Sequence, residues 1–208
     1  VIAKSVEKGK VFIAGLGLGL LNDELIKLGI NPNQQVVAEL NDDVIRIVGP
    51  KFKKNPKNSM DLRQGDFKDV LRAAISAGER FRAIMIDAYP NTAKDVNRDA
   101  SSEEVLKLAW EALEPGGVLT FYPDSMFLPP RVYDILKGLG VPDCAIHYGV
   151  ADFHTSKFTH KYHYGKSMGV IQITKPLLSE DQAKLLTERL DLSVSPPQAV
   201  KGLELLAA

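Results

Sequence analysis

The chain has 208 residues, enough for one domain with a sizeable core but too few for two domains of ordinary size. Lys and Arg together number 26, as do Asp and Glu, so no net charge attracts nucleic acid or an anionic membrane. No apolar run approaches the roughly 18 residues of a membrane span, and no signal peptide opens the sequence. Cys144 is the single cysteine, which excludes an internal disulfide. We therefore expect a cytoplasmic protein without nucleic-acid or membrane partners.

The first recognisable unit covers residues 10–39. An apolar strand over 10–15 runs into the glycine-rich turn Gly15-Leu16-Gly17-Leu18-Gly19, which is followed by a short helix over 22–28. We expect Asn22 or Asp23 to cap that helix, because such side chains accept hydrogen bonds from unpaired backbone N–H groups. A second apolar strand, Gln35–Glu39, completes a β-turn-α-β unit typical of nucleotide-binding sheets.

The rest of the chain continues the alternation of strands and helices. A capping box, Ser101 to Glu104, indicates one helix start, and the turn Glu114-Pro115-Gly116-Gly117 precedes a strand. Between the last two strands no helix is apparent, so we expect them to form an antiparallel hairpin at one edge of a mostly parallel α/β sheet. Further strands are predicted at 60–66, 81–87, 118–122, 145–150 and 168–174, and helices at 42–48, 69–77, 132–139, 179–190 and 198–206.

Several residues at strand ends are candidates for binding a nucleoside. The glycine turn matches a dinucleotide fingerprint only in part, because Leu20 stands where the third glycine belongs. Glu39 can accept hydrogen bonds from both hydroxyls of a ribose, and Asp66 can accept one from an adenine amine beside the apolar Phe67. The alternatives are a tight turn without a ligand, a surface Glu and an exposed loop Asp.

Taken together, the glycine turn, Glu39, Gly65-Asp66 and the Pro115-Gly116-Gly117 turn resemble the S-adenosylmethionine-dependent methyltransferases of the Rossmann-like class. The resemblance covers residues 10–175 and implies a seven-stranded, mostly parallel sheet with an antiparallel last strand and helices on both faces. It implies S-adenosyl-L-methionine as cofactor and no metal. We expect residues 1–175 to form the methyltransferase domain and 176–208 to be its helical extension. The cofactor-binding residues would be Gly15, Gly17, Gly19, Glu39, Asp66, Phe67 and Asp87.

A narrower resemblance concerns the end of the fourth strand. The run Asp87-Ala88-Tyr89-Pro90 is similar to the Asp-x-Tyr-Pro segment of guanidinoacetate and arginine N-methyltransferases. It implies a small-molecule methyl acceptor, an amine or a guanidino compound, with Asp87 as base or substrate anchor and Tyr89 beside it. The segments 91–100 and 123–131 have no clear counterpart in that family. Asp87 as a mere support of its loop remains the alternative.

Two other functions stay open from the sequence. One is an aminopropyltransferase of the spermidine synthase type, although Tyr89-Pro90-Asn91 stands where such enzymes carry a second Asp. The other is a non-catalytic module that kept the fold, as one part of a homo-oligomer or larger assembly. The segment 147–164 holds all four histidines among aromatic residues. Acceptor binding, a histidine base, a metal site and a solvated or packed loop are the alternatives, although the histidine spacing does not match a standard zinc site. Cys144, before an apolar strand, is expected to be buried.

Overall fold

The computed structural model describes residues 9–53, 55, 58–88, 102–121, 128–152 and 167–176. The predicted segment 91–100 lies outside these residues, as do residues 1–8 and residues 123–127 of the segment 123–131. So do Tyr89, the histidines at 154, 160 and 163, and both helices predicted beyond residue 176.

Seven strands form one mixed sheet, in the order β3-β2-β1-β4-β5-β7-β6. Strands β3, β2, β1, β4 and β5 are parallel to one another, whereas β7 is antiparallel to both β5 and β6. The predicted Rossmann-like sheet with an antiparallel last strand is therefore confirmed. The strands are β1 (Val11–Ala14), β2 (Gln35–Glu39), β3 (Asp61–Gln64), β4 (Phe81–Ile86), β5 (Leu113–Phe121), β6 (Ile146–Asp152) and β7 (Ser167–Thr174).

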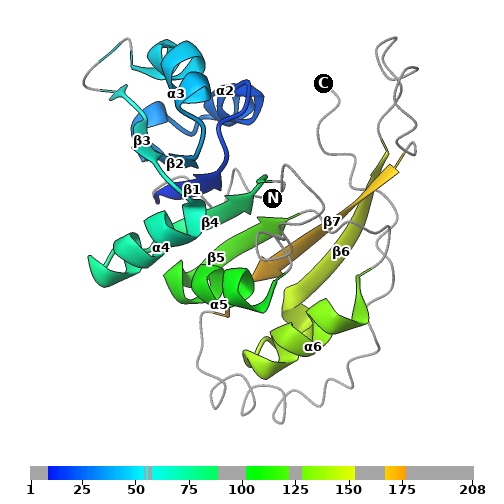
Figure 1. Cartoon of the computed structure of the whole chain (residues 1–208). Coiled ribbons are helices and arrows are strands. Elements are labelled where there is room, and N and C mark those ends of the chain that lie inside the picture. The colour runs from blue at the N-terminus through cyan, green and yellow to red at the C-terminus, as the bar shows by residue number, and fades with distance from the viewer. Residues whose placement is uncertain are drawn as a thin grey trace.

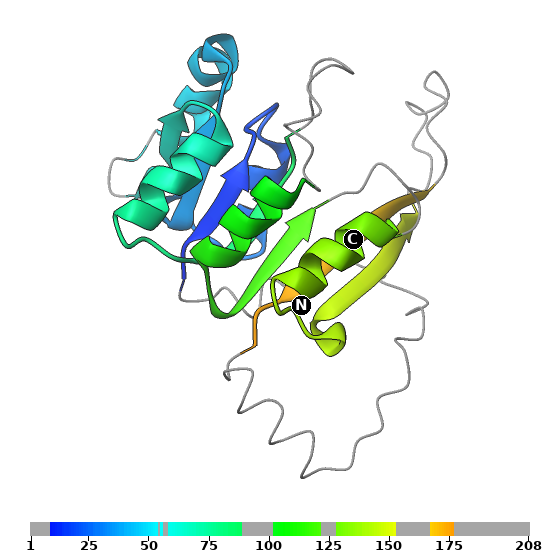
Figure 2. The same ribbon diagram turned by 60° about the horizontal axis from the view of Figure 1, so that its bottom comes forward.

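Helices cover both faces of the sheet (Figure 1). One face carries α4, α5 and α6, which lie side by side in Figure 2, and the other carries α2 and α3. The helices are α2 (Leu20–Lys27), α3 (Asp42–Val48), α4 (Phe67–Ser76), α5 (Glu103–Ala112) and α6 (Pro130–Gly138), with 3-10 turns η1 (Pro32–Gln34), η2 (Gly49–Phe52) and η5 (Asp143–Ala145).

The first strand shows why the sheet divides the core in two. All four residues of β1 are fully buried, and successive side chains point to opposite faces. Phe12 and Ala14 join the core under α4, α5 and α6, whereas Val11 and Ile13 join the core under α2. A strand buried on both faces reads as one continuous apolar run, which is the pattern of residues 11–14.

The start of α2 differs from the prediction. Gly19, with φ of 73°, is the residue before the helix, and no side chain caps it. Asn22 is instead fully buried inside the helix, where its amide donates to Gln35 Oε1 at 2.9 Å. The expected cap was wrong because Asn22 has a buried polar partner 13 residues away, and a buried polar group needs such a partner.

Three smaller differences concern local boundaries. Ser102 caps α5, one residue later than the predicted capping box, and the position that should hold its glutamate is Val105. The Pro-Gly-Gly turn forms the irregular first part of β5, where the register shifts and Gly116 adopts φ of 73°. Cys144 is exposed rather than buried, because the chain at η5 turns Ala145 into the core in its place.

Candidate functional site

The carboxyl edge of the parallel strands brings three predicted residues into one row. Ala14 of β1 pairs with Ala38 of β2 and with Ile86 of β4. The residues that follow these three positions are Gly15, Glu39 and Asp87, so they lie side by side across β2, β1 and β4. In doubly wound sheets ligands bind at this edge.

A cavity of about 480 Å³ opens at this edge. Its lining comes from the turns after β1, β2, β3 and β4 and from the first turns of α3 and α4. Of the predicted cofactor residues it includes Gly15, Gly17, Glu39, Asp66, Phe67 and Asp87. The volume lies within the range of small-molecule sites.

Gly19 does not line the cavity, although it was predicted with the other two glycines. A Cβ atom at this position would lie 2.7 Å from the Phe52 ring and 3.2 Å from Val48. Its positive φ and this close contact explain why glycine stands here. Gly19 thus packs the start of α2 against the end of α3 and against η2.

Glu39 is the most connected side chain of the site. Its Oε2 accepts hydrogen bonds from the backbone N–H groups of Leu16 at 2.8 Å and Gly17 at 3.4 Å, and its Oε1 accepts one from Asn41 at 2.8 Å. Asn41 Oδ1 in turn accepts from Asp43 N and caps α3. Glu39, a residue only 9% exposed, therefore ties the glycine turn to the start of α3 through its carboxylate.

Asp66 and Phe67 form another part of the wall. The Asp66 carboxylate caps α4, because it accepts a hydrogen bond from the backbone N–H of Lys68 at 2.9 Å. Phe67, the first residue of α4, is 6% exposed and packs into the core while lining the cavity. The pair thus places an acceptor group and an apolar surface next to each other after β3.

Asp87 follows β4 and is held by its backbone. Its N–H donates to the carbonyl of Ala14 at 3.1 Å, and a Cβ on Gly15 would lie 3.0 Å from the Asp87 carbonyl oxygen. The side chain remains exposed to the cavity, yet partial loss of hydration raises the pKa of its carboxyl group above the ordinary value. Among the described residues no hydrogen bond or ion pair reaches this carboxylate.

The charge of the described lining has one sign. Glu39, Asp66 and Asp87 contribute carboxylates, and no Lys, Arg or His is among the described residues that line the cavity. Such a wall attracts a cation and repels a phosphate or a sulfate group.

Sequence reasoning missed part of the wall. Leu40, Asn41 and Val44 also line the cavity, although none was predicted as a site residue. The available signal was their position directly after the carboxyl end of β2, together with the Asn-Asp-Asp start of a helix.

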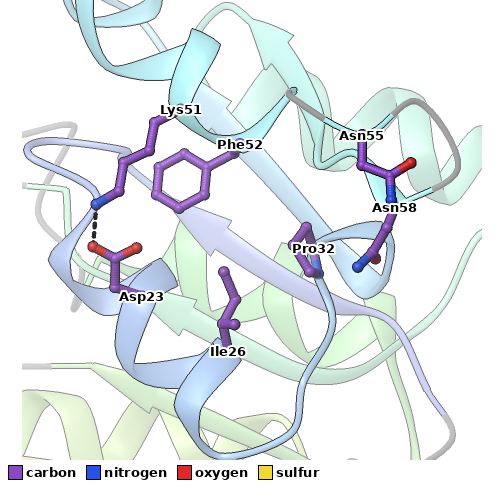
Figure 3. Close-up of a pocket in the computed structure, with 7 residues that line it drawn as sticks. All are labelled: Asp23, Ile26, Pro32, Lys51, Phe52, Asn55 and Asn58. Atoms are coloured by element: carbon purple, nitrogen blue, oxygen red, sulfur yellow. Dashed lines mark hydrogen bonds and ion pairs between the residues drawn. The ribbon is translucent and has the colours of Figure 1, made fainter.

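A second hollow, of about 220 Å³, lies between α2 and η2 (Figure 3). Ile26, Pro32 and the Phe52 ring give it an apolar lining. Lys51 at its rim makes an ion pair with Asp23 and lies 5.1 Å from the centre of the Phe52 ring. No predicted site residue lines this hollow, and its lysine is already paired, so the cavity at the carboxyl edge is the candidate site.

The described residues contain no group of His, Cys, Asp and Glu that could hold a metal ion. His147 lies exposed on β6, and the three other histidines of the 147–164 segment are outside the described part. No helix within that part is long and apolar enough to cross a membrane.

Comparison with known proteins gives matches to solved structures only. No protein-family model matches the sequence, and a search of curated proteins finds no match. The N-methyltransferase NodS from Bradyrhizobium japonicum WM9 is similar over 84% of this chain and 90% of its own, with a TM-score of 0.56 and 13% identity. Human methyltransferase-like protein 13, solved in complex with S-adenosylhomocysteine (SAH), is similar over 99% of this chain and 91% of its own, with a TM-score of 0.54 and 13% identity.

Spermidine synthase from Thermotoga maritima is also similar, over 85% of this chain, with a TM-score of 0.57 and 14% identity. The matched region spans 58% of the synthase. At 13 and 14% identity these likenesses concern the fold alone. The chain has the Rossmann-like fold that methyltransferases and spermidine synthases share.

Proposed function

We propose that the chain is an S-adenosylmethionine-dependent methyltransferase that methylates a nitrogen of a small amine or guanidino compound. One observation carries this proposal. Gly15, Glu39 and Asp87 share a row at the carboxyl edge of the sheet, on the wall of a cavity whose described charges are all carboxylates. The fold shared with SAH-bound methyltransferases supports it.

The glycine turn favours a sulfonium cofactor over a dinucleotide. A dinucleotide site needs free backbone N–H groups and often a cation for its phosphates. Here the N–H groups of Leu16 and Gly17 donate to Glu39, and that of Gly19 donates to the Leu16 carbonyl. A carboxylate therefore stands where a phosphate would have to bind.

The donor set fits the parts of S-adenosylmethionine. Each Glu39 oxygen has two lone pairs. Oε1 has one backbone donor and keeps a lone pair for one ribose hydroxyl, and Oε2 can accept the second hydroxyl in place of its long 3.4 Å contact with the Gly17 N–H. The Phe67 side chain offers an apolar surface to the adenine ring, and Asp66 offers an acceptor for its amine. The glycine turn and Asp87 are left for the sulfonium and amino-acid part.

When bound, S-adenosylmethionine supplies a methyl group on a positively charged sulfur, and its transfer is an in-line displacement. The chain must hold the attacking nitrogen in line with the methyl group, which lowers the barrier by fixing the geometry of attack. Asp87 anchors this nitrogen by accepting its N–H hydrogen bond and takes up the proton as base, a role worth about 10²–10⁴-fold. The raised pKa of Asp87 brings it closer to the range of a working base.

Tyr89 is proposed to line the acceptor side, as its spacing from Asp87 indicates, and it lies beyond the described residues. The proposed acceptor is a free small molecule in the cytoplasm. Measuring the mass of the protein in solution shows whether it is a homo-oligomer or part of a larger assembly.

Aminopropyl transfer is the second candidate. Decarboxylated S-adenosylmethionine lacks the carboxylate that an all-acidic wall repels, and the spermidine synthase fold is similar. The two donors differ in one carboxylate group, so comparing their affinities separates the two functions. A non-catalytic module would bind a donor and transfer nothing.

The test begins with SAH binding, measured by calorimetry and by thermal shift. At a concentration of about 100 times its dissociation constant, SAH adds about 2.7 kcal/mol to the stability of the folded state. Labelled S-adenosylmethionine is then offered with a panel of amines and guanidino compounds, to wild type and to Asp87→Asn. If millimolar SAH leaves the melting temperature unchanged, the cofactor assignment is wrong. Tighter binding of the decarboxylated donor, with transfer of its aminopropyl group, establishes the second candidate.

A further inference from the structure

We propose that Asp87 makes the cavity select the positively charged sulfonium cofactor over its neutral thioether product, so that loss of charge on transfer promotes product release. This inference rests on the proposed function, and it concerns which state of the ligand the site prefers.

The position of Asp87 along the ligand follows from the strand order. Glu39 and Asp87 follow strands separated only by β1, so about 10 Å divides their places in the row. If the ribose lies at Glu39 and the adenine at Phe67, then Gly15 and Asp87 line the cavity on the side of Glu39 away from Phe67, as the strand order places them. The sulfur, which is one methylene group from the ribose ring, then lies on the Asp87 side.

The carboxylates of the wall differ in how many donors they already have. Glu39 accepts three backbone hydrogen bonds, and Asp66 accepts one from the N-terminal turn of α4. These N–H groups are positive dipoles that already stabilise the two negative charges. Asp87 receives no hydrogen bond and no ion pair from the described residues, and partial burial raises its pKa. Of the described lining, Asp87 therefore has the most to gain from a ligand cation.

The charge of the sulfur changes in the reaction. The carbon–sulfur bond to the methyl group breaks and a carbon–nitrogen bond forms, while the electron pair of the broken bond stays on sulfur. The sulfur changes from a cation into a neutral thioether, and the nitrogen gives up one proton to the Asp87 carboxylate, which passes it on to solvent. Attraction between Asp87 and the sulfur thus exists before transfer and is lost after it.

The preference of the site for the cationic ligand is limited in size because Asp87 is partly exposed to water. A unit-charge pair a few ångströms apart near a protein surface is worth several times less than in a dry interior, because water screens it. We expect S-adenosylmethionine to bind about tenfold tighter than SAH, a ratio that corresponds to about 1.4 kcal/mol.

The experiment measures the affinity of both ligands, and of sinefungin, for wild type and Asp87→Asn by calorimetry. Sinefungin carries a protonated amine in place of the methylsulfonium group and cannot react. We expect the two cations to lose about tenfold in affinity on Asp87→Asn, while SAH changes little. Asp143→Asn is the matched control. It makes the same charge change in η5, at the opposite edge of the sheet, and should alter no affinity.

Wild type alone supplies a second measurement if the variant does not fold. Raising the salt concentration from about 0.05 to 0.5 M should weaken the two cations several-fold and leave SAH nearly unchanged. Equal affinities of the three ligands for wild type would overturn the inference, and so would a cation preference that survives in Asp87→Asn. Both results leave the methyltransferase proposal intact, whereas absence of binding by all three ligands refutes both.

Discussion

Glu39 offers the sharpest test of how the site is built, because its carboxylate holds two loops at once. Replacing it with Gln keeps the size of the side chain and leaves one acceptor oxygen. The new amide nitrogen then faces either the glycine turn or the Asn41 N–H, and a donor facing a donor makes no hydrogen bond. Replacing it with Ala removes all three hydrogen bonds.

The expected magnitude follows from the two short contacts, each of 2.8 Å, and the weaker one of 3.4 Å to Gly17. A hydrogen bond to a charged group contributes roughly 1.5–3 kcal/mol. Glu39→Gln should therefore lower the free energy of unfolding by about 1.5–3 kcal/mol. Glu39→Ala loses all three hydrogen bonds but also avoids the cost of desolvating a carboxylate, so we expect a loss of about 2–4 kcal/mol.

Urea denaturation of the ligand-free protein, followed by circular dichroism, measures these losses. Glu24→Gln is the control, because Glu24 lies half-exposed on α2 and its one partner among the described side chains is Lys27, so the change in stability should be less than about 0.5 kcal/mol. If Glu39→Gln unfolds at the same urea concentration as wild type, Glu39 does not anchor the two loops. The carboxylate would then be present for the ligand alone.

Three other predictions use single substitutions. Gly19→Ala should lower the free energy of unfolding, measured with denaturant, by about 2–4 kcal/mol, because the residue has a positive φ and its Cβ would contact Phe52. Gly29→Ala is the control, because Gly29 has φ of 91° but open space around it, and it should lose about 1–2 kcal/mol. Equal losses in the two variants would exclude the contact with Phe52. Asp87→Asn should raise the melting temperature at pH 7, and this gain should shrink toward pH 4. Burial raises the pKa of the Asp87 carboxyl group in the folded state, so the wild type loses stability as the pH rises through that pKa. A pH-independent difference would contradict this. Lys175→Met should lower the free energy of unfolding by about 1–3 kcal/mol, since its ammonium donates to two carbonyls at the end of α5, each at 2.8 Å; an unchanged urea midpoint would refute that role.

The sequence predicts most of the fold because its local signals agree with the final structure. The ranges of β2 and α3 match their prediction residue for residue, since an apolar run ends at Glu39 and Asn41 can cap the helix that follows. The row of Gly15, Glu39 and Asp87 also follows from sequence, because parallel strands end at a common edge.

The predictions that differ from the structure depend on contacts between residues far apart in the sequence. The burial of Asn22 depends on Gln35, and the position of Gly19 outside the cavity depends on Phe52. The three hydrogen bonds that Glu39 accepts also cannot be predicted from the sequence, because they depend on the path of the glycine turn in space. Local patterns report which residues end a strand, and tertiary packing decides what each of them touches.

The place of β7 has a consequence for how the chain is made. This last strand lies between β5 and β6, which do not pair with each other in the sheet. Among the described strands, β5 therefore has an open edge and β6 has no neighbour during synthesis until residue 174 has left the ribosome. An exposed strand edge invites pairing with other chains, so a nascent or truncated chain lacking β7 is the form most prone to aggregate.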